Sequence, residues 1–287
     1  MNLKLLRNVC LMIALVLSNY TWSLTREPQS YVISSKLSNQ VAGYYFDNGF
    51  KHRRSVPSTS SLDRLIIYGC EIERRLEHLQ VIYICETPSE SDIEEQAFLL
   101  PIPSPIDQLN IARAIISGDI EIAVIYSRKS EIQYKYLETN KHESIRISGY
   151  KSYGSLKFDQ QVKDVIKQND AVLALADESI FNESTQRALM LNTYRERRPV
   201  FGPNESFVVS GSIATLCITE EDIAKSAIRL IKSFEETEYL PGIYFPISPK
   251  IVTNNTAAKT FSLKLPDDEI IGKKILQASL GDKVNEF

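Results

Sequence analysis

Histidine is scarce in this sequence, and the motifs of the commonest catalytic and nucleotide-binding sites are missing. The only histidines are His52, His78 and His142, and their spacing fits neither a metal site nor a catalytic triad. The sequence contains no P-loop, no GxGxxG and no HExxH. We therefore expect no metal, no cofactor and no enzyme activity.

A strong excess of charge is missing too, as is any long apolar run beyond the N-terminus. The formal net charge is -3, and no basic stripe with interleaved aromatics favours nucleic acid or an anionic membrane as a partner. A membrane-spanning helix requires roughly 20 apolar residues, and no stretch reaches that length. We expect a protein that neither binds nucleic acid nor spans a membrane once its leader is removed.

The N-terminus has the pattern of a secretory signal peptide, residues 1–23. Lys4 and Arg7 precede an apolar run from Val9 to Leu17, and small and polar residues follow. The alternatives are a buried N-terminal helix, which would lack the usual polar face, and a lipoprotein anchored at Cys10, which has no small residue before it. We therefore predict export to the periplasm.

The remaining chain alternates short apolar runs with segments of helical period. The apolar runs are continuous in Val, Ile and Leu, which is typical of strands buried on both faces of a parallel sheet, so the pattern predicts an α/β architecture. The clearest helices cover residues 157–168 and 220–234, and a further helical pattern stops at Gly118. The predicted strands are 31–34, 65–68, 81–85, 122–126, 144–148, 171–175, 199–201 and 213–218, whereas 52–61 has a loop-like composition.

One junction places polar residues where a ligand could bind. The strand 171–175 is followed by Asp177, Glu178 and Ser179, and the next helix starts at Asn182. In α/β sheets ligands bind beyond the carboxyl ends of the strands. The alternative is that Asp177 and Ser179 form only a capped turn, as at most such junctions.

Four stretches together resemble a known family. They are "LDRLIIYGCEIERRL" with "VIYICETP", then "PIPSPIDQLNIARAIISGDIEIAVIYS", then the segment from "DAVLALADESIF" through "RRPVFGPNESFVVSGSIATLCITEEDIAKSAIRLI", and finally "SPKIVTNNTAAKTFSLKLPDDEI". Their order over residues 62–287 is similar to that of the periplasmic substrate-binding proteins of ABC importers, in the group related to tryptophan- and tyrosine-binding members.

The resemblance implies a type I periplasmic-binding-protein-like fold, with two doubly wound parallel-sheet lobes joined by a hinge. Lobe 1 would comprise residues 24–119 and 213–247, and lobe 2 residues 120–212 and 248–287. A ligand would lie in the cleft between the lobes, with helix N-termini facing its anionic group.

The resemblance also suggests ligand-binding positions. Relative to the family pattern, Ala176 replaces a proline, Cys70 replaces a small hydroxyl residue, and Glu86 lengthens an aspartate. The strand-helix unit before residue 62 is shorter than in the family pattern, which would leave the cleft open on one side. The residues that stand at the family's motif positions, and that we predict to bind ligand, are Gly69, Cys70, Glu86, Thr87, Asp177, Ser179 and Asn204.

Cys70 and Cys85 follow the ends of two strands that should be neighbours in one sheet. Their Cα atoms could then lie within the roughly 4.4–6.8 Å that a disulfide requires, and export exposes the chain to oxidising conditions. We predict a Cys70–Cys85 disulfide, and the alternative is two buried free thiols.

The function expected from the resemblance is that of an exported solute-binding protein. It would hold a small organic molecule, an amino acid or an amine, and present it to a membrane permease or sensor. The alternative is an interaction module that has lost its ligand and regulates a membrane receptor or kinase, and the shortened first unit motivates it.

Overall fold

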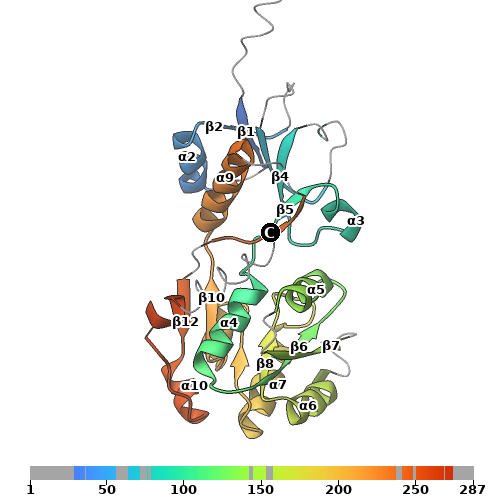
Figure 1. The fold of residues 1–287 in the computed structure, drawn as a ribbon, viewed down its shortest axis with the longest axis vertical. Helices are drawn as coiled ribbons and strands as arrows, with labels where there is room; N and C mark the ends of the chain where they lie inside the picture. The colour runs from blue at the N-terminus through green and yellow to red at the C-terminus, as the bar shows by residue number, and fades with distance from the viewer. Residues whose placement is uncertain are drawn as a thin grey trace, which may run out of the picture.

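The protein folds into two lobes, each built on a six-stranded sheet. The computed structural model describes residues 29–35, 37–55, 64–71, 76, 79–141, 145–152, 158–236, 241–247, 250–267 and 269–273. The predicted signal peptide lies outside these residues. Figure 1 shows the lobes one above the other along the long axis.

The sheet of lobe 1 has the strand order β11-β5-β4-β3-β1-β2, and every neighbouring pair is parallel. Its strands are β1 Ser30–Ile33, β2 Phe50–Arg53, β3 Arg64–Tyr68, β4 Gln80–Ile84, β5 Ala97–Leu99 and β11 Gly242–Tyr244. Its helices are α2 Asn39–Asp47, α3 Glu90–Ile93 and α9 Glu220–Glu236. Helices α2 and α9 bury their apolar sides against one face of the sheet, with Ile66 and Ile82 among the residues they cover.

The sheet of lobe 2 has the order β12-β10-β9-β8-β6-β7, in which only β12 runs antiparallel to its neighbour. Its strands are β6 Glu121–Tyr126, β7 Arg146–Lys151, β8 Ala171–Ala174, β9 Val200–Phe201, β10 Ala214–Cys217 and β12 Lys250–Thr253. Its helices are α4 Pro105–Ile115, α5 Glu131–Asn140, α6 Phe158–Gln168, α7 Glu183–Arg195, α8 Glu205–Ser210 and α10 Asn255–Thr260.

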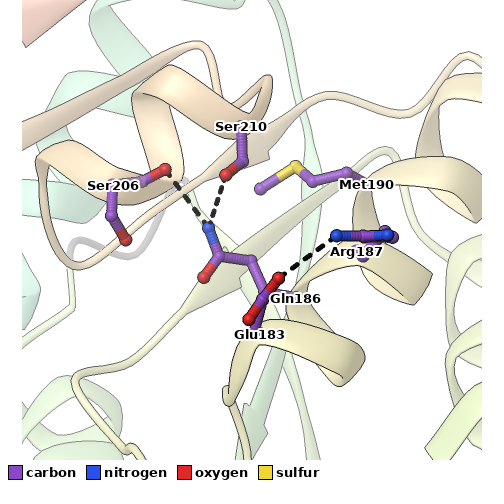
Figure 2. A pocket seen from close by; sticks show the side chains of 6 residues that line it. All are labelled: Glu183, Gln186, Arg187, Met190, Ser206 and Ser210. Carbon is purple, nitrogen blue, oxygen red and sulfur yellow. Dashed lines mark hydrogen bonds and ion pairs between the residues drawn. The ribbon is translucent and has the colours of Figure 1, made fainter.

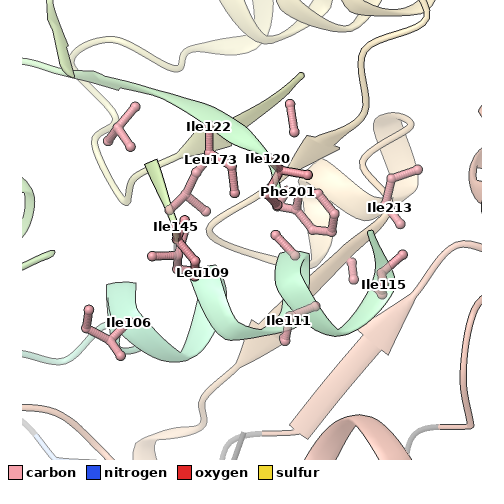
Figure 3. Close-up of a cluster of buried hydrophobic side chains, with 14 of the residues drawn as sticks. Ile106, Leu109, Ile111, Ile115, Ile120, Ile122, Ile145, Leu173, Phe201 and Ile213 are labelled. Atoms are coloured by element: carbon pink, nitrogen blue, oxygen red, sulfur yellow. The ribbon is translucent and has the colours of Figure 1, made fainter. Parts of the chain in front are cut away.

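Helix α4 shows how the sequence builds the core of lobe 2. Pro105 occupies the first turn, where its missing N–H costs no hydrogen bond, and the Ser104 side chain caps the helix by accepting from the Asp107 N–H. Leu109 and Ile115 are then buried in the same cluster as residues of β6, β8 and β10 (Figure 3). Burying such side chains stabilises the fold by about 1.5–3 kcal/mol each.

Over the residues that the structure describes, the chain passes between the lobes three times: between β5 and α4, between β10 and α9, and between β11 and β12. The predicted lobe boundaries are wrong at two of these passages. Helix α4, placed in lobe 1 by the prediction of 24–119, packs in lobe 2, and so does β10, which pairs with β9 and β12. Apolar periodicity shows that a segment is buried, but not against which sheet.

Most predicted elements are confirmed, and the errors fall on polar or short strands. The segment predicted as a loop from 52 to 61 begins inside β2, an edge strand in which only Phe50 is buried. The strand predicted at 144–148 occupies Arg146–Lys151 instead. The short strands β5, β11 and β12 were not predicted. Strands β11 and β12 lie at sheet edges, where few buried side chains are needed and the apolar signal is weak. Strand β5 lies inside its sheet and is fully buried, but with three residues it is too short to show a period.

Candidate functional site

The predicted residues of lobe 1 lie at the C-terminal edge of its sheet. Gly69 and Cys70 follow β3, while Glu86 and Thr87 come just after β4, and all four are exposed. Cys70 is bonded to Cys85, with their Cα atoms 5.0 Å apart, so the predicted disulfide is confirmed. The bridge removes the Cys70 thiol as a hydrogen-bond donor, and it ties together the loops that follow β3 and β4.

The predicted residues of lobe 2 lie at the corresponding edge of the second sheet. Asp177 and Ser179 follow β8, and Asn204 follows β9. Asn204 is exposed but acts as the N-cap of α8, where its side-chain oxygen accepts from the Phe207 N–H at 3.3 Å. Its side chain therefore already has a structural partner, although the remaining amide group faces solvent.

Helix α5 brings the two edges together. Ile132, in its first turn, is buried in the same cluster as Cys85 of lobe 1. One turn later, Lys135 forms an ion pair of 2.5 Å with Glu90 of α3, and the Tyr136 ring packs on Phe245 with centroids 4.8 Å apart. Figure 1 shows α3 and α5 facing each other across the junction of the lobes. The two sets of predicted residues therefore lie on facing edges.

Asp177 is the most connected of the predicted residues. Its Oδ2 accepts from Ser127 Oγ at 2.5 Å and from Ser130 Oγ at 2.6 Å, and its Oδ1 accepts from the N–H (3.0 Å) and the hydroxyl (2.5 Å) of Ser179. Its exposure is only 6%. Burial alone would raise the pKa of Asp177, but these hydrogen bonds favour the charged form and hold the pKa below its ordinary value.

The sequence prediction missed the serines that surround Asp177. Ser127 follows β6 and Ser130 precedes α5, so both stand at the edge beside the turn after β8. Gln133 of α5 strengthens the same junction by donating to the Ala176 carbonyl at 2.9 Å. The signal was present in "YSRKS", where a strand ends in a serine just before a helix. Ser127 is the last residue of the second stretch that resembles the family, but neither Ser127 nor Ser130 was among the predicted ligand-binding positions.

Two of the tyrosines near this edge pack against the protein itself. The Tyr134 ring stacks on Tyr126, with centroids 4.2 Å apart and planes 3° from parallel. It also covers Gly149, where an added Cβ would lie 2.3 Å from the Tyr134 ring. Tyr136 is engaged with Phe245, as described above. These rings position β6, β7 and α5 rather than standing free for a ligand.

A surface pocket between α7 and α8 contains none of the predicted site residues (Figure 2). Gln186 crosses it and donates to the Ser206 carbonyl at 3.2 Å and to Ser210 Oγ at 2.8 Å. Arg187 at its rim pairs with Glu183 at 3.2 Å, and both side chains are largely exposed. The polar groups of this pocket are thus paired with each other, and we do not assign it a function.

The described ranges contain no group of three or more His, Cys, Asp or Glu side chains that could hold a metal ion. In the same ranges, every helix is too short or too polar to cross a membrane.

Comparison with known proteins identifies the fold. No family model matches the sequence, and no curated protein does. Among solved structures, the ligand-free, open structure of a substrate-binding protein with adhesive properties from Clostridium difficile has a TM-score of 0.52 and 12% sequence identity, covering 85% of this chain and 97% of that one.

Two further structures resemble the chain less closely. A Streptococcus pneumonia ABC domain in complex with L-Trp has a TM-score of 0.49 and 13% identity, over 87% of this chain and 98% of that one. A conserved domain protein from Vibrio cholerae has a TM-score of 0.48 and 13% identity, over 86% of this chain and 98% of that one. Together with the two parallel-dominated sheets and the three described passages between them, the likeness to the Clostridium difficile protein shows that this protein has a type I periplasmic-binding-protein-like fold.

Proposed function

We propose that the protein is an exported solute-binding protein that holds a small, amino-acid-like molecule between its lobes. The observation that carries the proposal is the placement of Glu86 and Thr87 on one strand edge and Ser179 and Asn204 on the facing one. Loops beyond the carboxyl ends of parallel strands are where α/β sheets bind ligands. Export from the predicted signal peptide and delivery to a membrane permease or sensor belong to the same proposal.

A second candidate function is supported by the contacts that already join the lobes. Ile132 is buried against lobe 1, the Asp177 carboxylate accepts its hydrogen bonds from serines of the protein itself, and Cys70 is held in a disulfide. A protein whose lobes are held together without ligand could serve as a rigid interaction module that regulates a membrane receptor or kinase. This candidate requires no small molecule.

A thermal-shift screen of amino acids, amines and small aromatic compounds separates the two functions. A ligand that binds only the folded state stabilises it by about 2.7 kcal/mol at 100 times its Kd, which raises the melting temperature by several degrees. We expect at least one compound to do so. Failure of every compound would favour the interaction module.

A matched pair of variants places the ligand. Glu86→Gln removes a charge at the proposed site, whereas Glu196→Gln removes one from an exposed residue at the opposite end of α7. We expect the first substitution to weaken binding of the compound found in the screen and the second to leave it unchanged. Equal effects of the two substitutions would argue against a site between the lobes.

A further inference from the structure

The hydrogen bonds around Asp177 fix where the protons of its neighbours point. A serine hydroxyl has one proton to donate, and an ionised carboxylate can only accept. Ser127 and Ser179 both donate to Asp177, at 2.5 Å each. Their oxygens therefore have no proton left for any other partner.

These two oxygens lie close together at the edge that faces lobe 1. Ser127 Oγ and Ser179 Oγ are 3.2 Å apart. Because both hydroxyls donate their protons to Asp177, the two oxygens turn lone pairs toward each other. Ser127 Oγ accepts one N–H, from Lys129 at 3.0 Å. Ser179 is exposed, so its remaining lone pairs face solvent. A group with several N–H bonds could donate to both oxygens at once.

The charge at this point is also uncompensated. Within the described part of the chain, no Lys or Arg side chain forms an ion pair with Asp177, and the four hydrogen-bond donors to its carboxylate are neutral groups of three serines. Arg128 and Lys129, in the same loop, point to solvent as exposed residues, and Lys151 pairs with Glu131 at 2.8 Å. The hydrogen bonds stabilise the carboxylate but leave its negative charge in place, so an arriving cation would gain a favourable Coulomb interaction with it.

We infer that the oxygens of Ser127 and Ser179, backed by Asp177, bind the primary ammonium group of the ligand. This inference rests on the proposed solute-binding function and narrows its ligand to compounds with a protonated amine. An ammonium group has three N–H donors and no acceptor. It can therefore donate to two serine oxygens whose own protons point to Asp177, and its positive charge would lie near the buried carboxylate. Asp177 is a positioning residue: it turns the serine protons inward and does not touch the ligand.

The test uses sets of compounds that share a carbon skeleton and differ in one group, such as 2-phenylethylamine, 2-phenylethanol and phenylacetate, together with matched aliphatic sets. Binding to the full mature protein is measured at pH 7 by calorimetry and by thermal shift. We expect the amines to bind and the matching alcohols and acids to bind at least about tenfold more weakly, as for loss of a hydrogen bond to a charged group.

Three variants show whether the preference arises from these residues. Ser179→Ala removes one acceptor oxygen from an exposed position and should weaken amine binding about tenfold or more. Asp177→Asn introduces an amide N–H that donates to a serine, frees a serine proton and removes the charge, so amine and alcohol should then bind alike. Glu178→Gln removes an exposed neighbouring charge without changing these protons, and it should keep the preference.

The outcomes are distinguishable. Alcohols or acids that bind as tightly as amines would overturn the inference and leave the solute-binding function standing. Amine binding that Ser179→Ala leaves unchanged would do the same, provided that the variant melts like the wild type without ligand. Stabilisation by no compound of any class would overturn both proposals.

Discussion

The Cys70–Cys85 disulfide offers a direct measure of what holds lobe 1 together. The two cysteines are 15 residues apart, and the bridge closes a loop that runs from the end of β3 through β4. Cys85 is buried in the same cluster as Ile132, whereas Cys70 is exposed. Replacing both cysteines with serine opens this loop in the unfolded chain and leaves the rest of the sequence unchanged.

The expected cost follows from the entropy of loop closure. For a loop of this length the chain-entropy relation gives about 3 kcal/mol at 25 °C. At about 2–4 °C per kcal/mol for a chain of this size, the double serine variant should melt about 6–12 °C below the wild type. Differential scanning calorimetry without reductant measures the difference, and Cys217→Ser, which alters a cysteine outside the bridge, is the control.

Three results would refute this reasoning. Melting temperatures of the wild type and the double variant that agree within about 1 °C would show that the closed loop contributes no stability. Titration of the unreduced, denatured mature protein that finds three free thiols would show that the bridge does not form. A drop of similar size in Cys217→Ser would show that the loss arises from cysteine replacement in general.

Three other predictions test the contacts that position the site. Lys135→Glu places two carboxylates opposite each other between the lobes, so the radius of gyration measured by small-angle X-ray scattering should rise. Adding Glu90→Lys restores opposite charges and should restore the radius, whereas an unchanged radius in Lys135→Glu would show that this ion pair does not hold the lobes together. Gly149→Ala should lower the free energy of unfolding by about 1 kcal/mol, because the stacked Tyr134 ring must move. Gly43→Ala, at a helical position with open space around it, should raise the free energy of unfolding by about 0.5–1 kcal/mol. Urea denaturation measures both, and the opposite ranking would contradict the packing described. The pKa of Asp177 is lowered in the folded state, so its carboxylate stabilises the fold fully above the unfolded pKa of about 4, and this stabilisation is lost as pH falls through the folded pKa. The difference in free energy of unfolding between the wild type and Asp177→Asn should therefore shrink in acid, and a difference that stays constant would refute the linkage.

The local sequence was sufficient to predict much of lobe 2 and several strands of lobe 1. Continuous apolar runs predicted β4, β6 and β8, because strands covered on both faces have no polar side. Helix α9 was predicted from its apolar period and from the capping box between Thr219 and Asp222, which the structure confirms with hydrogen bonds in both directions. The disulfide was predicted because the strands that precede Cys70 and Cys85 were expected to be neighbours in one sheet, and β3 and β4 do pair.

The site was predicted only in part. Asp177 and Ser179 stand at the strand edge as expected, but the alternative of a capped turn also holds in part, since the Ser179 N–H and hydroxyl both bind the Asp177 carboxylate. The partners Ser127 and Ser130 come from 50 and 47 residues earlier in the chain. No local pattern in the sequence shows that the Asp177 carboxylate will accept hydrogen bonds from residues so far away along the chain.

By itself, the sequence determined the periodicities, the helix caps, the strand ends and the polar residues that follow them, because each of these depends on neighbours within a few residues. Only the tertiary structure decided that α4 and β10 belong to lobe 2, that α5 reaches across to lobe 1, and that the protons of two serines turn toward Asp177. Those outcomes depend on which surfaces meet in space. Apolar patterning favours burial against any complementary face, and it cannot distinguish between two similar sheets in one chain.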